Sequence, residues 1–179
     1  MTPTAAPAIR TARADEYAAV GGLTVRAYTA GGLMPPDDPY LPRLGDARTR
    51  AAEAELLVAV DPTGRLVGTV TFARHGSPYA ELAAPGEADF RMLAVDPDVR
   101  GGGIGAALVT ECIRRARAAG ADRLRLSTGA GMLAAQHIYA RLGFVRTPKL
   151  DWTPPAARHD LQTYVLDLTQ RPRSDRLPE

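Results

Sequence analysis

The 179-residue chain has a single cysteine, little net charge and no long apolar run. One cysteine excludes an internal disulfide framework and suits a reducing compartment. The formal net charge is only +2, and no local run of Lys or Arg is present, which disfavours nucleic acid as a partner. No apolar stretch approaches the ~18 residues of a membrane span, and the first residues lack the regions of a signal peptide. We therefore expect a cytoplasmic protein that binds neither membranes nor nucleic acid.

Histidine is also scarce. The three histidines, His75, His137 and His159, are far apart and show no metal-ligand spacing. Cys112 falls on an apolar helical stripe with no histidine beside it in the sequence to activate its thiol. The sequence therefore predicts no metal site and no thiol nucleophile, and it predicts His137 on the surface.

The composition is that of one packed domain. Hydrophobic residues make up 45% of the chain and charged residues 23%, which is enough for a core and normal for a globular protein. A chain of this length suits one ordinary domain. We expect that domain over residues 8–168, with residues 1–7 and 169–179 as flexible termini.

Hydrophobic periodicity and turn signals predict both helices and strands. The expected strands cover residues 8–12, 56–60, 65–74, 88–95, 122–128, 144–148 and 161–168. Four helices are expected. Two start near Asp15 and Asp46, and the other two cover residues 103–119 and 131–144. Segment 31–42, rich in proline, is expected to lack regular structure. A hairpin followed by a strand–helix–strand unit implies a mixed α/β sheet with helices on its faces.

The stretch Arg100–Ala106, "RGGGIGA", joins a strand directly to a helix. The first N–H groups of a helix have no partners within the helix, so bare backbone at this point favours an anion such as phosphate. A nucleotide P-loop is excluded because no lysine follows the glycines. A dinucleotide fingerprint fits Gly101, Gly103 and Ala106, but the next strand ends without the acid that this motif needs. A plain flexible loop is the remaining alternative.

Two motifs together resemble the GNAT (GCN5-related) N-acetyltransferase family. The first is [Q/R]-x-x-G-x-[G/A], carried by Arg100, Gly103 and Gly105. The second is A-x-x-x-Y-x-x-x-G-F, carried by Ala135, Tyr139, Gly143 and Phe144. The resemblance covers about residues 8–168. One departure is Met132, which stands where many relatives have Asn.

The resemblance implies an acyl-CoA N-acyltransferase fold and acetyl-CoA as the acyl donor. The sheet would be mostly antiparallel, with about seven strands, helices on both faces and a splay at the middle strands. The pyrophosphate would lie on the backbone of Arg100, Gly101, Gly102, Gly103, Ile104, Gly105 and Ala106. The pantetheine arm would pair with Leu93, Ala94 and Val95. Within the glycine stretch, Gly103 and Gly105 are expected to be required, and Gly101 and Gly102 permissive.

The same resemblance implies roles for three side chains. Tyr139 matches the family's general acid, which protonates the departing thiolate. The attacking amine must be neutral, so a base helps at pH 7, and either Asp89 or Glu87 could serve. Arg91, on the same strand face, could pair with Asp89. A backbone N–H near Leu93 would hold the oxyanion.

The acceptor remains open at this stage. Family relatives place it against segments that correspond to 28–42 and 147–160. The first segment holds Tyr28, Met34, Asp37, Asp38 and Tyr40, and the second holds Trp152 and His159. Their acids and aromatics favour a cationic amine on a small molecule, with a protein N-terminus or lysine as the alternative. A non-catalytic acyl-CoA-binding regulator and a nicotinamide-dependent oxidoreductase are further alternatives, and a homodimer is compatible with the family.

Overall fold

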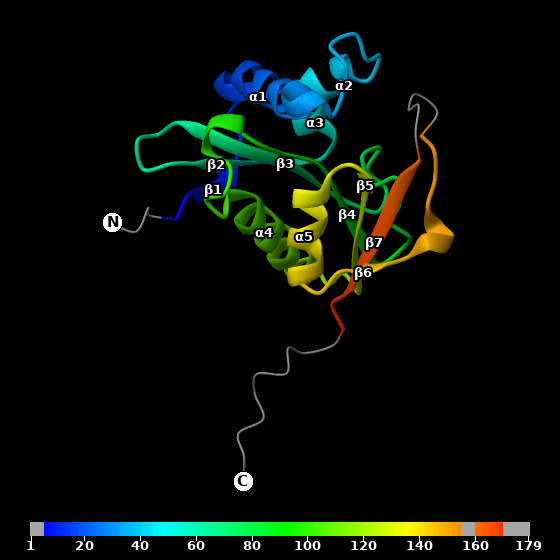
Figure 1. Ribbon diagram of the computed structural model, residues 1–179. Helices are drawn as coiled ribbons and strands as arrows, with labels where there is room; N and C mark the ends of the chain where they lie inside the picture. The colour runs from blue at the N-terminus through cyan, green and yellow to red at the C-terminus, as the bar shows by residue number, and fades with distance from the viewer. Residues whose placement is uncertain (1–5, 155–159, 170–179) are drawn as a thin grey trace.

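A seven-stranded mixed sheet in the order β1-β2-β3-β4-β5-β7-β6 forms the centre of the protein (Figure 1). The structure is a computed structural model and describes residues 6–154 and 160–169. The strands are β1 (Ala8–Thr11), β2 (Glu55–Val60), β3 (Leu66–Arg74), β4 (Glu87–Val95), β5 (Arg123–Gly129), β6 (Val145–Arg146) and β7 (Leu161–Asp167). Neighbouring strands are antiparallel except β4 and β5, which run parallel. The predicted mixed sheet of about seven strands is confirmed.

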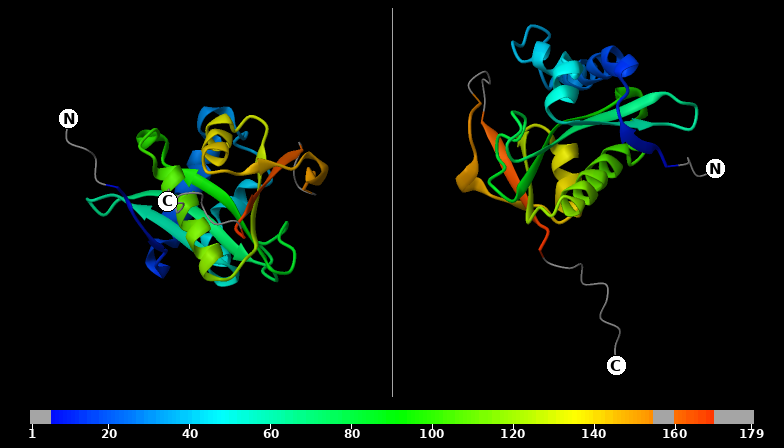
Figure 2. Two further views of the ribbon diagram at one scale, coloured as in Figure 1. Left: turned by 90° about the horizontal axis from the view of Figure 1, so that it is seen from below. Right: turned by 180° about the vertical axis from the view of Figure 1, so that it is seen from behind.

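Helices cover both faces of this sheet (Figures 1 and 2). On one face lie α1 (Tyr17–Thr29), α2 (Leu41–Gly45) and α3 (Ala47–Glu53). On the other lie α4 (Ile104–Ala118) and α5 (Leu133–Arg141). This arrangement follows from the βα order of the chain, because a parallel β4–β5 pair needs a crossover helix, here α4.

The main core lies between the sheet and α4. Leu108, Cys112 and Ala116 form the fully buried stripe of α4, as their i+4 spacing predicts. Gly68 on β3 allows the close approach of this helix. A Cβ atom at Gly68 would lie 2.9 Å from both Ile104 Cγ2 and Leu108 Cδ1. The start of α4 is therefore pressed onto the middle of the sheet.

The proline-rich segment 31–42 contains more regular structure than predicted. A 3₁₀ turn covers Ala30–Gly32, and α2 starts at Leu41. Pro42 occupies the first turn of α2, where a missing N–H costs nothing, so proline does not prevent the helix. The predicted cap of α3 is confirmed, since the Asp46 side chain accepts a hydrogen bond from the Thr49 N–H at 3.0 Å.

Several predictions fall outside the described residues. Residues 1–5 and 170–179 do so, and the expectation of flexible termini is therefore untested there. His159 also lies outside them. Across the residues that the structure does describe, none of the helices has the length and apolar character needed to cross a membrane.

Candidate active site

The sheet opens between β4 and β5. These strands pair only at Glu87, Ala88 and Asp89, opposite Arg123, Leu124 and Arg125. Farther along β4 a bulge breaks the regular pairing with β3, because Thr69 faces Ala94 whereas Thr71 faces Arg91. The bulge includes Met92, whose φ of 55° is the one positive value among non-glycine residues in the described ranges. The predicted splay at the middle strands is confirmed.

Beyond the bulge, backbone groups of β4 face the opening. The Asp96 N–H donates to Val67 O on β3 at 3.0 Å. Backbone groups alternate in direction along a strand, so those of Val95 and Leu93 point the other way, toward the space that β5 has left. This is where the sequence predicts the pantetheine arm, along Leu93, Ala94 and Val95.

The glycine stretch forms an anion cradle at the start of α4. Gly103 is the N-cap residue, with φ 76° and ψ 3°. Within the described residues, the N–H groups from Gly101 to Ala106 have no hydrogen-bond acceptor, and the first bond of the helix is from Ala107 N to Gly103 O. Free N–H groups at the positive end of a 15-residue helix suit a phosphate.

The four glycines of this stretch differ in how strictly the structure requires a glycine at each position. Gly101 has φ 89°, so it is not the permissive position that the sequence predicted. Gly102 is permissive as predicted, because its φ is ordinary and a Cβ atom would lie 3.7 Å from Val99 O. Gly103 is required by its positive φ. Gly105 is required by packing, since a Cβ atom there would lie 2.9 Å from Ile138 Cδ1 on α5.

Arg100 connects the cradle to the other face of the sheet. Its guanidinium NH2 group donates to Ala27 O, near the end of α1, at 2.9 Å. This bond holds the guanidinium at the end of α1, and its contribution of positive charge to the cradle stays a prediction.

The turn from β5 into α5 is held by a residue that sequence reasoning missed. Met132, at the N-cap of α5, makes no side-chain capping bond. Gln136, one turn later, donates from its amide to Gly129 O at 3.0 Å and to Ala130 O at 3.1 Å. Its position four residues after the departure at Met132 was the available signal.

Asp89 is a buried carboxyl group with one hydrogen bond. Its side chain is almost entirely buried, and Oδ2 accepts the Leu82 N–H at 3.1 Å. Burial raises the pKa of Asp89 to about 7, and the Leu82 bond and the nearby Arg91 oppose this rise. The suggested pairing with Arg91 is not present, since the ion pair of Arg91 is with Glu81. Near neutral pH, Asp89 can take or give a proton.

Glu87 has the opposite electrostatic environment. Its carboxylate accepts hydrogen bonds from Arg125 at 2.9 Å and from Arg123 at 3.2 Å. These bonds, with one from the Ala84 N–H, lower the pKa of Glu87 to about 2 against the opposing effect of burial. A carboxylate held in this way is a poor proton acceptor at neutral pH, so the geometry favours Asp89 over Glu87 as a base.

Tyr139 lies on the other side of β4 from Asp89. It is buried, and its ring makes edge contacts with Phe90 and Phe144, both with centroids 5.9 Å away. Phe90 alternates with Asp89 along β4, so the phenol and the carboxyl lie on opposite faces. Burial, with a further contribution from the Tyr28 phenol, raises the pKa of Tyr139 above its usual range. Tyr139 therefore stays protonated at neutral pH.

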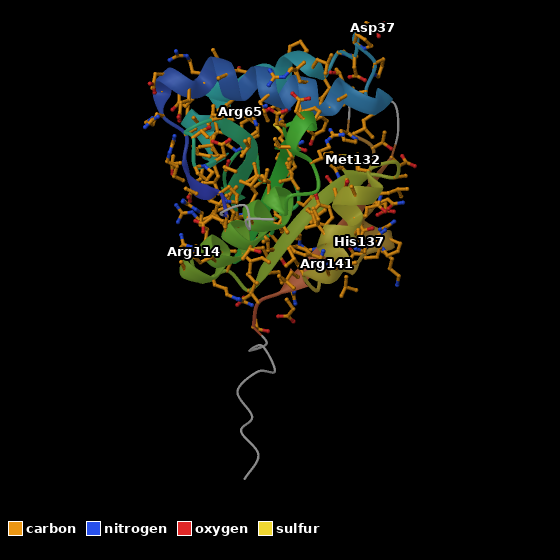
Figure 3. All side chains as sticks on the ribbon, turned by 60° about the vertical axis from the view of Figure 1, so that its left-hand side comes forward. Asp37, Arg65, Arg114, Met132, His137 and Arg141 are labelled. Carbon is orange, nitrogen blue, oxygen red and sulfur yellow. The ribbon has the colours of Figure 1, made fainter. Side chains whose placement is uncertain are left out.

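A pocket of about 370 Å³ lies at the open end of the β4–β5 gap, and we call it the β4–β5 pocket. It is lined by Tyr28, by residues of segment 33–40, by Arg91 and Met92, by residues 127–132, and by Pro154, Asp160 and Leu161. Four of the residues expected around an acceptor, Tyr28, Met34, Asp38 and Tyr40, line it. Asp37 does not, and Figure 3 shows it at the outer tip of its loop. Trp152 is also not among the lining residues.

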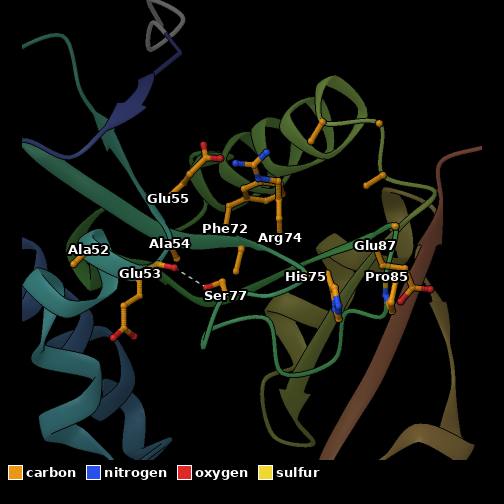
Figure 4. A pocket seen from close by; sticks show the side chains of 15 residues that line it. Ala52, Glu53, Ala54, Glu55, Phe72, Arg74, His75, Ser77, Pro85 and Glu87 are labelled. Atoms are coloured by element: carbon orange, nitrogen blue, oxygen red, sulfur yellow. Dashed lines mark hydrogen bonds between the residues drawn. The ribbon is translucent and has the colours of Figure 1, made fainter.

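A larger groove, of about 640 Å³, lies away from this region (Figure 4). It runs between the end of α3, the end of β3 and the end of α4, and Glu87, Arg74 and His75 line it. Neither Tyr139 nor the glycine cradle contributes to it. The larger cavity is therefore not the candidate site. Glu87 lines this groove and Asp89 does not, which is a further difference between the two acids.

Comparison with known proteins gives the family. The model of the Acetyltransferase (GNAT) family matches residues 20–144. This chain belongs to the GNAT acetyltransferase family. The match spans both motifs described above, and it confirms the resemblance that the sequence suggested.

Among proteins with related sequences are mycothiol acetyltransferases. The chain is 32% identical over 146 residues to the one from Cellulomonas flavigena, covering 76% of this chain and 42% of that protein. It is 34% identical over 149 residues to the one from Salinispora arenicola, covering 70% and 45%. This GNAT chain therefore spans less than half the length of these relatives.

Solved structures share the fold. A GNAT acetyltransferase from Staphylococcus aureus Mu50 superposes with a TM-score of 0.72 at 18% identity, covering 91% of this chain and 99% of that one. A putative acetyltransferase from Salmonella typhimurium, solved with its cofactor acetyl-CoA, gives 0.66 at 20%, covering 94% and 98%. A Brucella melitensis GNAT acetyltransferase in complex with acetyl-CoA gives 0.60 at 25%, covering 90% and 87%.

Other reactive residue types of this GNAT domain lie outside the site. Cys112 is fully buried in the main core, and burial raises the pKa of its thiol. His137 projects from the exposed side of α5 (Figure 3). Residues 6–154 and 160–169 contain no cluster of His, Cys, Asp or Glu that could hold a metal ion.

Proposed function

We propose that this protein transfers an acetyl group from acetyl-CoA to the primary amine of a small molecule. The observation that carries this proposal is the gap between β4 and β5. Free backbone groups of β4 and a phosphate cradle lie along it, and Asp89 and Tyr139 lie on opposite faces of β4. Acetyl-CoA supplies the acetyl group as a thioester.

The chain would hold the donor through its backbone. The N–H groups from Gly101 to Ala106 fit a pyrophosphate, because they are free and converge at the start of α4. The backbone of Leu93 and Val95 fits an extended amide-bearing arm, because it faces an unpaired strand position. A side chain at Gly103 would strain the loop because of its positive φ, and one at Gly105 would push the start of α4 away from Ile138 on α5.

Asp89 is the proposed general base. It would take a proton from the incoming ammonium, directly or through a water, and leave a neutral amine to attack the thioester carbon. A base with a pKa of about 7 is matched to neutral pH. Its deprotonated form is the active one, so the rate should rise with pH through about 7.

Tyr139 is the proposed general acid. As the new N–C bond forms and the C–S bond breaks, the Tyr139 hydroxyl would give its proton to the departing thiolate. The Leu93 N–H next to the bulge would stabilise the oxyanion of the transition state. The products are the acetylated amine and free CoA.

The β4–β5 pocket supports a small acceptor over a protein side chain. Its volume of about 370 Å³ is within the range of small-molecule sites. The named activity of the mycothiol acetyltransferase relatives supports the same choice. The acidic residues Asp38 and Asp160 at the pocket suit an ammonium group. A homodimer remains a prediction.

Two measurements test this function. Free thiol should be released from acetyl-CoA when a panel of primary amines is added, whereas a non-catalytic regulator would bind acetyl-CoA and release none. Acetyl-CoA at about 100 times its dissociation constant should stabilise the fold by about 2.7 kcal/mol, and NAD(P) should not. Stabilisation by NAD(P) alone would favour an oxidoreductase instead.

A further inference from the structure

The inner part of the β4–β5 pocket carries a positive charge. Arg91 is the only cationic side chain among its described lining residues. One guanidinium nitrogen, NH2, donates to the Tyr40 hydroxyl at 3.0 Å. The Nε atom of Arg91 is buried and has no hydrogen-bond partner among the described residues. A buried donor without an acceptor is unfavourable, and a ligand oxygen would relieve it.

The carboxylate beside Arg91 does not cancel this charge. Glu81 Oε1 lies 2.6 Å from Arg91 NH1 and 3.0 Å from Arg43 NH2. One carboxylate therefore serves two guanidinium groups. Asp89, the next acid on this face of β4, carries only part of a negative charge near pH 7. Arg91 thus shares its nearest carboxylate with a second guanidinium.

A second buried arginine adds to this field. Arg50 on α3 is fully buried and donates to the hydroxyls of Thr24 at 3.0 Å and Thr71 at 3.4 Å. It forms no ion pair with any residue that the structure describes. Its charge acts on Tyr28, a lining residue, by opposing the rise in the pKa of that phenol. A second guanidinium, without a carboxylate partner among the described residues, therefore acts on a residue that lines the pocket.

Neutral hydrogen-bond donors accompany the charge. The hydroxyls of Tyr28, Ser127 and Thr128 line or border the pocket. The Thr128 Oγ1 atom is buried without a partner, and neither of the other two hydroxyls is hydrogen-bonded within the described ranges. Hydroxyl groups next to a guanidinium are the donor set that a carboxylate needs.

Apolar and acidic groups complete the pocket. Leu33, Met34 and Leu161 provide apolar surface. The acids are partly engaged, because Asp38 Oδ1 accepts the Tyr40 N–H at 2.8 Å and Asp160 accepts a hydrogen bond from Thr153. The pocket therefore offers separate places for an apolar group, an ammonium and an anion.

We propose that Arg91 binds a carboxylate on the acceptor, so that the acceptor is a free amino acid or a similar small amine with a nearby carboxylate. This inference rests on the proposed function. Arg91 directly precedes the bulge at Met92, and both residues line the β4–β5 pocket. A carboxylate on Arg91 would therefore lie in the same pocket as the amine that the proposed reaction acetylates. Arg91 acts here as a specificity-determining residue.

The test compares acids with their amides. Thiol release from acetyl-CoA would be measured with L-leucine, L-methionine and L-phenylalanine, each paired with its carboxamide. The amides keep the amine and the apolar side chain but lack the anion. The wild-type protein should prefer the acids by at least about tenfold in kcat/KM, as expected for one charge-assisted contact. Equal or better turnover of the amides would overturn the inference.

Three variants assign the preference to Arg91. Arg91→Gln should remove it, mainly by raising KM for the acids, and Arg91→Lys should retain part of it. Arg43→Gln is the matched control, because Arg43 contacts the same Glu81 but does not line the pocket. It should keep the preference. A preference that persists in Arg91→Gln, or disappears in Arg43→Gln, would contradict the assignment.

A binding measurement separates this inference from the proposed function. Melting temperatures would be recorded with each acid and each amide in the presence of CoA. If no amine releases thiol but the acids alone raise the melting temperature, and do so only when Arg91 is intact, the carboxylate site stands and the acetyltransferase proposal fails. If thiol is released but acids and amides bind equally, the acetyltransferase proposal stands and the carboxylate site fails.

Discussion

The two sides of β4 build the candidate site in different ways. On the donor side, the groups that would hold acetyl-CoA are backbone atoms of one continuous stretch, residues 93–106. On the acceptor side, side chains come from α1, the loop after it, β4 and the segment before β7. The first half depends on main-chain geometry and the second on which side chains meet in space.

This difference should make the two halves separable by mutation. A change of backbone geometry in the glycine cradle should weaken donor binding and leave acceptor preference intact. A change at Arg91 should do the reverse. The proton-transfer groups, Asp89 and Tyr139, lie one on each side, so their variants should affect turnover without removing either binding site.

The largest expected effect is on donor binding. Gly103→Val places a β-branched side chain at φ 76°, a conformation that it strongly disfavours, and should rotate the first N–H groups of α4 away from the pyrophosphate. The loss of two charge-assisted hydrogen bonds corresponds to a dissociation constant for acetyl-CoA at least about 100-fold higher. Isothermal titration calorimetry measures it. Unchanged affinity would show that the cradle does not bind the donor.

The next effect is on the proposed base. Asp89→Asn should lower kcat about 100-fold at pH 8, with retained acetyl-CoA affinity, and abolish the rise of rate through pH 7. The variant should also melt higher at pH 8. The native pKa of Asp89 is about 7, above the ~3.9 of an unfolded Asp. Its contribution to stability is therefore complete below about pH 4 and lost as the pH rises through 7.

Glu87→Gln provides the contrast. The native pKa of Glu87 is about 2, below the ~4.3 of an unfolded Glu, so its ion pairs stabilise the fold above about pH 4.3 and are lost toward pH 2. The variant should melt lower at neutral pH and keep the same midpoint in its pH–rate profile. A shifted midpoint in Glu87→Gln, with an unaltered one in Asp89→Asn, would exchange the two assignments.

Tyr139→Phe should have a smaller effect. Removing the phenol hydroxyl should reduce turnover at least about tenfold while donor affinity remains within about twofold, because the ring contacts with Phe90 and Phe144 persist. Tyr164→Phe is the matched control, since its ring packs 5.9 Å from that of Tyr139. Wild-type turnover in Tyr139→Phe would refute the general-acid role.

The smallest effect is expected at Gly102. Gly102→Lys should change the affinity for acetyl-CoA by less than about threefold, because the position has an ordinary φ and a Cβ atom there would make only an ordinary contact, 3.7 Å from Val99 O. Gly101→Lys should weaken binding more, because its φ of 89° disfavours any side chain. Titration of both variants decides whether the conformational difference between these neighbours matters. Equal affinities would mean that the loop adapts to either substitution.

The order of the elements and the donor side could be predicted from the sequence because their signals are local. Periodicity identified the strands and helices, and the glycines marked the start of α4. The prediction for the donor side was wrong only at Gly101, because its positive φ depends on how the loop meets α4. Gln136 was missed because its partners are backbone carbonyls, and its spacing from Met132 was the one sequence signal that pointed to it.

The acceptor side could be predicted only in part, because it depends on contacts between distant segments. Segment 28–42 was expected beside the acceptor, and residues of this segment line the β4–β5 pocket. The ion pair of Arg91 with Glu81 was not expected, because Glu81 lies in the loop before β4 and no sequence signal indicates that this loop folds back onto the strand. The distinction between Asp89 and Glu87 likewise depends on Arg123 and Arg125, which approach through β4–β5 pairing.

The contact between Gly105 and Ile138 has one more consequence. It locks the start of α4 against α5, and Tyr139 is the next residue along α5. The distance between the proposed pyrophosphate site and the Tyr139 hydroxyl is therefore fixed. A thioester on a shorter or longer arm would miss the phenol even if its phosphates were well bound. In the proposed mechanism, the protein would therefore select its acyl donor by the length of the arm.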